Sequence, residues 1–136
     1  MTGAAPTTSL AVLDVDECLL LLADHHLGRL AVIVGQQPMV FPVNYALAGR
    51  DVVFRTDVGT KLYSAAGRLV AFEIDAADTT YHGGWSVLVL GVAVEEQDPI
   101  RRAALARLPL TAWCPGPKAH WMRIRSDAIT GRRVAL

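Results

Sequence analysis

Short apolar runs joined by turns of three or four residues are the feature that most restricts how this chain can fold. The run Leu30–Val34 is followed by a turn at 35–38, Met39–Leu47 by a turn at 48–50, and then comes Asp51–Thr56. Parallel strands need crossover connections of about a dozen residues or more, whereas antiparallel strands can be joined by turns this short. The spacing therefore predicts an antiparallel meander rather than a βαβ fold.

Further strands are expected in the second half of the chain. Apolar side chains alternate with others along Arg68–Asp75, which is typical of a strand with one buried face. Pro42 lies inside the second run and indicates an edge strand, a bulge or a place where the ladder opens, because proline cannot donate to a sheet. The remaining candidates are Gly83–Gln97 and a last strand made of His120–Arg125 and Ile129–Val134, either continuous or broken at 126–127.

Three short helices interrupt these strands. The first has Asp14 as its N-cap and Glu17 three residues later, which is the pattern of a capping box, and Gly28 is expected to end the segment. The expected helices are Val15–His26, Leu62–Ala66 and Pro99–Leu108. About six antiparallel strands with two or three short helices predict a small closed β-barrel, since closure removes exposed edges.

Composition narrows the function classes. The chain has 136 residues, of which 52% are hydrophobic and 19% are charged, and its net charge is zero. A single domain over residues 10–136, after a flexible segment 1–9, fits this length. No basic excess points to nucleic acid. The apolar content is high for a small monomer, so we expect a homodimer or a ligand cleft to cover part of it.

The cysteines and the apolar runs indicate a soluble, cytoplasmic protein. Cys18 lies in an apolar helical run and is expected to be a buried thiol, while Cys114 lies in a loop, so no disulfide framework is predicted. The residues 1–9 lack the features of a signal peptide. The longest apolar runs, at 18–23 and 85–94, are too short to cross a membrane.

The segment Phe54–Lys61 carries the most specific chemistry. A strand ends, a glycine allows a tight turn, and a helix begins, so backbone N–H groups can converge on an anion. Arg55 and Lys61 add positive charge, and Thr56 and Thr60 add hydroxyl groups. This composition suits one phosphate group, although an ordinary solvated turn has the same residues. The order is not that of a Walker A loop.

Several segments together resemble a known family. They include Phe-Pro-Val-Asn-Tyr, Phe-Arg-Thr and Gly-Thr-Lys, and the full set is 41–45, 54–56, 59–61, 84–93, 120–124 and 129–133. This set is similar to the pyridoxamine 5′-phosphate oxidase-like, FMN-binding split-barrel superfamily. The likeness is greatest to the small branch that includes nitroimidazole-resistance-type proteins.

The resemblance implies a mainly β fold, a six-stranded antiparallel split β-barrel, that forms a homodimer. It implies FMN bound at the dimer interface and an oxidoreductase acting on a small organic substrate. No catalytic residue is assigned, because hydride transfer is performed by the cofactor while the protein positions it. Carried over by position, the cofactor-binding residues are Val40, Phe41, Pro42, Val43, Asn44, Tyr45, Arg55, Thr56, Thr60, Lys61, Trp85, Ser86, Thr130 and Arg132.

Other readings stay open at this point. True pyridoxamine-phosphate oxidases carry a C-terminal Arg and His set that this sequence lacks, so synthesis of pyridoxal phosphate is not expected. Related branches bind a deazaflavin coenzyme, haem or lipid, so a deazaflavin-dependent reductase or a non-enzymatic binding module are the alternatives. A haem module would need an axial ligand such as His82 or His120. The histidines show no metal-ligand spacing, so no metal site is expected.

Overall fold

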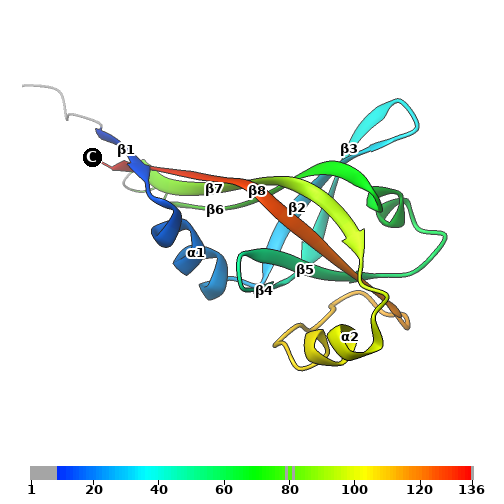
Figure 1. The fold of residues 1–136 in the computed structure, drawn as a ribbon. Helices are drawn as coiled ribbons and strands as arrows, with labels where there is room; N and C mark the ends of the chain where they lie inside the picture. The colour runs from blue at the N-terminus through cyan, green and yellow to red at the C-terminus, as the bar shows by residue number, and fades with distance from the viewer. Residues whose placement is uncertain (1–8, 79, 81, 136) are drawn as a thin grey trace, which may run out of the picture.

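The sheet is built around two long strands. The computed structural model describes residues 9–78, 80 and 82–135. Its strands form one sheet in the order β3-β2-β6-β7-β8-β5-β4, with β1 pairing β8, and every strand pair is antiparallel (Figure 1). The elements are β1 (Ser9–Leu13), α1 (Val15–Asp24), β2 (Leu27–Val34), β3 (Gln37–Asn44), β4 (Ala46–Ala48), β5 (Asp51–Thr56), the 3-10 helix η1 (Lys61–Ala65), β6 (Arg68–Asp78), β7 (Gly83–Glu95), α2 (Pro99–Leu105) and β8 (His120–Ala135).

The predicted fold class is confirmed: the protein is a mainly β split barrel with short helices. Eight strands replace the predicted six. One extra strand arises because the chain bends at Tyr45, whose backbone N–H donates to the carbonyl of His26 at 3.0 Å, so the expected run Met39–Leu47 becomes β3 and β4. The edge position expected from Pro42 is also confirmed, since the structure pairs β3 with β2 alone.

The other extra strand is β1, which the sequence did not indicate. It pairs with the last residues of β8, from Ser9 opposite Ala135 to Leu13 opposite Gly131. The flexible segment expected over 1–9 falls outside the described residues, apart from Ser9, which begins this strand.

Helix α1 begins as the sequence predicts and ends earlier. The side chain of Asp14 accepts from the backbone of Glu17 at 2.8 Å, and the reciprocal contact completes the capping box. The predicted end at His26 is wrong, because His25 already has an extended backbone. Gly28 does not terminate the helix. It lies in β2, where the ring of Phe72 occupies the space of a Cβ.

Two later helices also differ from their predicted bounds. Helix η1 covers Lys61–Ala65, one residue earlier than predicted, and α2 ends at Leu105 rather than Leu108. The last strand is continuous. Of the two alternatives at 126–127, the continuous strand is the one formed, and a β-bulge lies there, since Leu90 pairs with Ala128 and Gly91 with Ser126.

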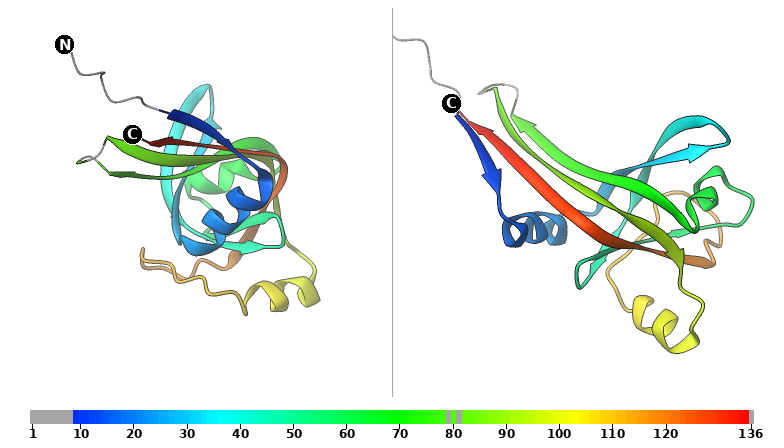
Figure 2. Two further views of the ribbon diagram at one scale, coloured as in Figure 1. Left: turned by 90° about the vertical axis from the view of Figure 1, so that its left-hand side faces the viewer. Right: turned by 45° about the horizontal axis from the view of Figure 1, so that its top comes forward.

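The two faces of the long strands differ in how they are covered. Inner side chains of β2, β6, β7 and β8 form the core with Cys18 and Leu22 of α1, all buried. Figures 1 and 2 show both helices on the same side of the β6–β7–β8 strands. The opposite side, the outer face, is not covered by any described helix.

The close approach at the bulge gives the first prediction. A Cβ at Gly91 would lie 1.9 Å from the backbone oxygen of Arg125, so Gly91→Ala must displace β8. We expect a loss of about 3 kcal/mol or more of unfolding free energy, measured by urea denaturation. The control is Gly35→Ala, which has open space and only a left-handed backbone, and should cost about 1 kcal/mol. Equal losses would contradict this account of the bulge.

Candidate functional site

One cavity gathers the middle of the predicted cofactor segment. It has a volume of about 150 Å³ and lies between β3, β5, η1 and the segment that follows α2. Most of its wall is apolar, with Asn44, Arg55 and Lys118 as its polar members and no carboxylate among its described lining residues. The lining residues are Phe41, Pro42, Val43, Asn44, Arg55, Leu62, Leu110, Ala112, Cys114 and Lys118.

Residues 109–118, here called the strap, close one side of this cavity. Alternate residues of the strap face opposite ways. Leu110, Ala112 and Cys114 line the cavity, whereas Pro109, Thr111 and Trp113 line a second hollow of about 470 Å³ beside α1. This alternation is that of an extended chain. The strap therefore separates the cavity from the second hollow and lines both of them.

Two predicted site residues hold the strap in place. The side-chain oxygen of Asn44 accepts from the backbone N–H of Trp113 at 2.9 Å. Arg55 donates from Nε to the carbonyl of Lys118 at 2.9 Å and from Nη2 to that of Pro117 at 3.2 Å. The guanidinium also lies 4.7 Å from the ring centroid of Trp121, a cation–π contact.

The turn expected to bind phosphate is internally bonded. The hydroxyls of Thr56 and Thr60 lie 2.9 Å apart, and that of Thr60 donates to the carbonyl of Asp57 at 2.8 Å and caps η1 through the N–H of Tyr63. Lys61 is exposed and does not line the cavity, while Thr56 is buried. The turn is formed as predicted, but its hydroxyls are already engaged with one another.

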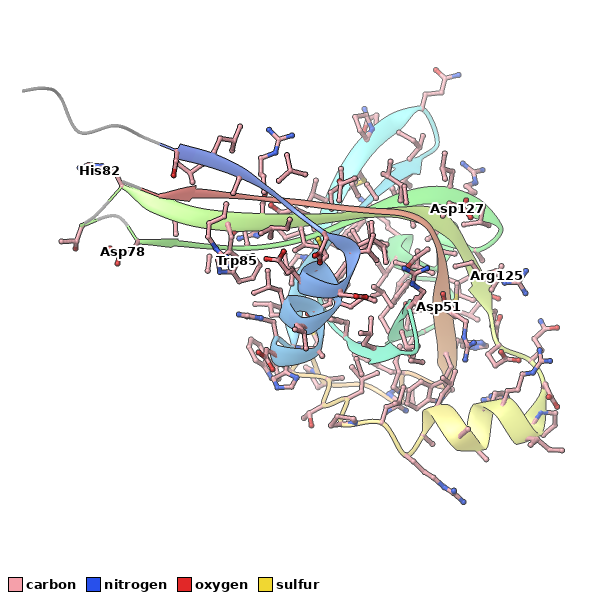
Figure 3. All side chains as sticks on the ribbon, turned by 60° about the vertical axis from the view of Figure 1, so that its left-hand side comes forward. Asp51, Asp78, His82, Trp85, Arg125 and Asp127 are labelled. Atoms are coloured by element: carbon pink, nitrogen blue, oxygen red, sulfur yellow. The ribbon has the colours of Figure 1, made fainter. Side chains whose placement is uncertain are left out.

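The other predicted residues lie elsewhere. Val40, Ser86, Thr130 and Arg132 are on the outer face, where Ser86 pairs with Arg132 across β7 and β8. Trp85 points to the opposite side (Figure 3). It packs edge-on against His25, which follows α1, with ring centroids 4.9 Å apart.

Tyr45 is in the core rather than in the cavity. Its hydroxyl donates to the carbonyl of Leu22 at 2.6 Å, and burial raises its pKa far above the usual range. It therefore supports the end of α1.

The outer face is apolar over much of its area. Val12 is 85% exposed and Val40 62%, and neighbouring strands add further large aliphatic side chains. Two hollows cross this face, of about 500 and 270 Å³, and share Glu73 and Leu88. The exposed aliphatic residues on it are Leu10, Val12, Val40, Leu69, Leu88 and Leu90. An uncovered apolar surface of this kind is typical of an interface.

A charged group stands in the middle of this face. Arg29 lies 3.3 Å from Glu73 and 3.4 Å from Asp75, so one cation serves two acids. Burial, followed by the neighbouring Asp75, raises the pKa of Glu73 to about 6, although Arg29 opposes the shift.

A second polar cluster joins η1 to the barrel. The carboxylate of Glu95 accepts from the hydroxyl of Tyr63 and from Nδ1 of His120, both at 2.6 Å. These two bonds, the Tyr63 bond first, lower the pKa of Glu95, and the same carboxylate raises the pKa of Tyr63. The cluster ties the start of β8 to the helix that follows the predicted phosphate turn.

The histidines, cysteines and acidic residues that the structure describes form no metal-binding cluster, since no three of their side chains come together as a metal site. Both cysteines are free, Cys18 buried as predicted and Cys114 exposed on the strap. No described helix is long and apolar enough to cross a membrane.

Comparison with known proteins identifies the family. A family model described as pyridoxamine 5′-phosphate oxidase matches residues 14–133. This chain belongs to that family. The "FAD binding protein" from Mycobacterium smegmatis is 41% identical, covering 90% of this chain and 98% of that one, with a TM-score of 0.79. A putative pyridoxamine 5′-phosphate oxidase from Corynebacterium glutamicum is 31% identical, covering 93% and 94%, with a TM-score of 0.81.

The branch suggested by the sequence shares the fold. A putative 5-nitroimidazole antibiotic resistance protein from Bacteroides thetaiotaomicron superimposes with a TM-score of 0.73, covering 96% of this chain and 91% of that one, at 10% identity. An identity this low speaks for the architecture alone. Lys118 and the strap were not among the residues predicted from the sequence. A loop with three prolines carries no periodic pattern that would place its side chains.

The Glu95 cluster predicts an acid-sensitive contact. Because its pKa is lowered below the ordinary 4.5, the carboxylate stabilises the fold above that pH and loses this contribution as pH falls through the lowered value. We expect Glu95→Gln to lower the unfolding temperature at pH 7 and to reduce the drop between about pH 5 and 3. The control is Glu96→Gln, a neighbour outside the cluster. The prediction would be contradicted if the unfolding temperature of Glu95→Gln fell between about pH 5 and 3 as much as that of the unaltered protein.

Proposed function

We propose that this chain forms a homodimer that binds a flavin nucleotide between its subunits, FMN first, and uses it to oxidise or reduce a small organic molecule. The observation that carries the proposal is that most of the predicted cofactor residues fall into two groups. Five of the fourteen line the cavity and four lie on the outer face, whereas the other five belong to neither group. In a dimer formed through the outer face, the outer-face residues of one subunit would complete the cavity of the other.

The size of the cavity supports a shared site. Its volume of about 150 Å³ is well below the roughly 300–1,000 Å³ of typical ligand pockets. One chain therefore offers a part of a nucleotide site. Strand β3 contributes to both parts, because Phe41, Pro42, Val43 and Asn44 line the cavity while Val40, just before them, lines a hollow of the outer face.

The polar atoms of the cavity fit a flavin. The side-chain nitrogen of Asn44 is buried and has no hydrogen-bond partner, and Arg55 and Lys118 add positive charge. A flavin nucleotide brings ring carbonyls and phosphate oxygens, which are acceptors for such donors. Apolar walls at Phe41, Val43 and Leu62 suit a flat ring.

Redox chemistry fits the shortage of acids and bases. A bound flavin supplies hydride transfer, so the protein needs only to hold the ring and tune it. Asn44 in the cavity and Ser86 and Thr130 on the outer face are neutral groups that can do this. The strap, with Leu110 and Ala112 toward the cavity, would exclude water from the same space.

FAD is the second candidate. The M. smegmatis relative at 41% identity is described as an FAD-binding protein. FAD carries the same ring and a phosphate next to the ribityl chain, so the donors of the cavity serve either nucleotide. The larger part of FAD would extend beyond the cavity.

The first test is the absorbance spectrum of the purified protein, before and after adding FMN or FAD and desalting. We expect oxidised-flavin bands to be retained, with chromatography of the released cofactor separating FMN from FAD. Anaerobic mixing with a reduced nicotinamide should then bleach these bands, as an oxidoreductase requires. Loss of both flavins on desalting would contradict the proposal. If the flavin is retained but no reductant bleaches its bands, the protein is a non-enzymatic binding module. If the purified protein shows the spectrum of a deazaflavin, it is a deazaflavin-dependent reductase.

The shared site gives a second test. Val12→Arg places a charge on the outer face at a side chain that is 85% exposed, so the single chain tolerates it, whereas a dimer would have to bury it. We expect a monomer in analytical ultracentrifugation and a loss of flavin affinity of about tenfold or more.

The control for this test is Ile100→Arg, at a side chain of α2 that is 81% exposed and away from the outer face. It should keep both the dimer and the affinity. A dimeric Val12→Arg protein with unchanged flavin binding would overturn the shared site.

A further inference from the structure

We infer that Lys118, carried by the strap, is the cation that binds the flavin phosphate in the cavity, in place of Lys61. The inference rests on the proposed function and assigns the residue that discriminates a phosphorylated flavin from riboflavin. The sequence pointed to Lys61 because it follows the glycine turn, whereas position 118 lies 57 residues further along the chain.

The two lysines differ in their surroundings. Lys118 lines the cavity and its side chain is 18% exposed, whereas Lys61 is exposed and lies outside the lining. A charge in a partly desolvated wall interacts more strongly with an anion than a charge in water, where the dielectric and salt screen it. Position alone therefore favours Lys118.

The ammonium group of Lys118 still has donors to offer. Its ion pair is with Asp57, whose carboxylate oxygen lies 3.9 Å from Nζ, longer than a hydrogen bond. Asp57 thus orients the side chain without occupying its three N–H donors. Asn44 adds a buried nitrogen with no partner to the same wall. The Lys118 ammonium and the Asn44 nitrogen thus lie on the lining of one cavity, and the oxygens of a phosphate would accept from both.

The backbone of Lys118 is held in an uncommon conformation. Its φ is 43°, in the left-handed region that non-glycine residues seldom adopt, and Gly116, two residues earlier, has a φ of 130°. Such a conformation persists where the surroundings fix it, and it concentrates at functional sites. Here Arg55 fixes it, through hydrogen bonds to the carbonyls of Pro117 and Lys118.

Arg55 and Lys118 therefore have different roles. The guanidinium of Arg55 lies over Trp121 and holds the strap, and this contact sets where the ammonium of Lys118 lies. Arg55 is a positioning residue in this arrangement, and Lys118 is the group that contacts the phosphate.

The test compares FMN with riboflavin, which has the same ring and no phosphate. In fluorescence-quenching titrations of the dimeric protein, Lys118→Met should weaken FMN binding about tenfold to a hundredfold, as expected for a lost charge-assisted hydrogen bond. The methionine keeps the apolar stem, so riboflavin binding should stay within about twofold. Lys61→Met, the matched control, should leave both affinities unchanged.

Each other outcome overturns the inference or the proposed function. If Lys61→Met and not Lys118→Met removes the preference for FMN, the phosphate is held at the turn. If Lys118→Met weakens both ligands equally, the residue only shapes the strap. Lys118→Asn, which tolerates a left-handed backbone, repeats the test should the methionine variant unfold. If the unaltered protein binds neither ligand, the proposed function itself fails.

Discussion

The pairing of β8 with three other strands is the constraint on which the rest of the structure depends. β8 pairs with β7 over almost its whole length, with β5 at its beginning and with β1 at its end. Its first part joins β5 and β4 to the curled sheet, and its last part joins β1. Because α1 packs under this sheet, the inner face is covered and the outer face is left free (Figure 1).

The strap shows how one charged side chain can organise a wall that has no regular secondary structure. An extended segment without a sheet partner has backbone groups that must be satisfied by other means. Asn44 and Arg55 do this from β3 and β5, and the Trp121 ring holds the guanidinium in place. Asn44, as an acceptor, and Arg55, as a donor, are both side chains that the family resemblance assigns to a cofactor, so the same residues are proposed to anchor the strap and to bind the cofactor.

Features that depend on neighbouring residues could be predicted from the sequence, whereas features that depend on contacts between distant residues could not. The capping box of Asp14 and Glu17, the turns and the edge position of Pro42 depend on neighbours in the chain, and they were predicted. Strand β1 depends on a partner over a hundred residues away, and the early end of α1 depends on His25 and Tyr45. The candidate site was predicted as a set of residues, but its division between a cavity and a face follows from strand geometry.

The extra residue in β8 inverts the alternation of its side chains. Before the bulge, Met122 and Ile124 point into the core, whereas after it Thr130 and Arg132, also at even positions, lie on the outer face. A strand without Asp127 would keep one phase throughout, and one half of its side chains would then face the wrong way. A single inserted residue thus lets one strand present its even-numbered side chains to the core before the bulge and to the outer face after it.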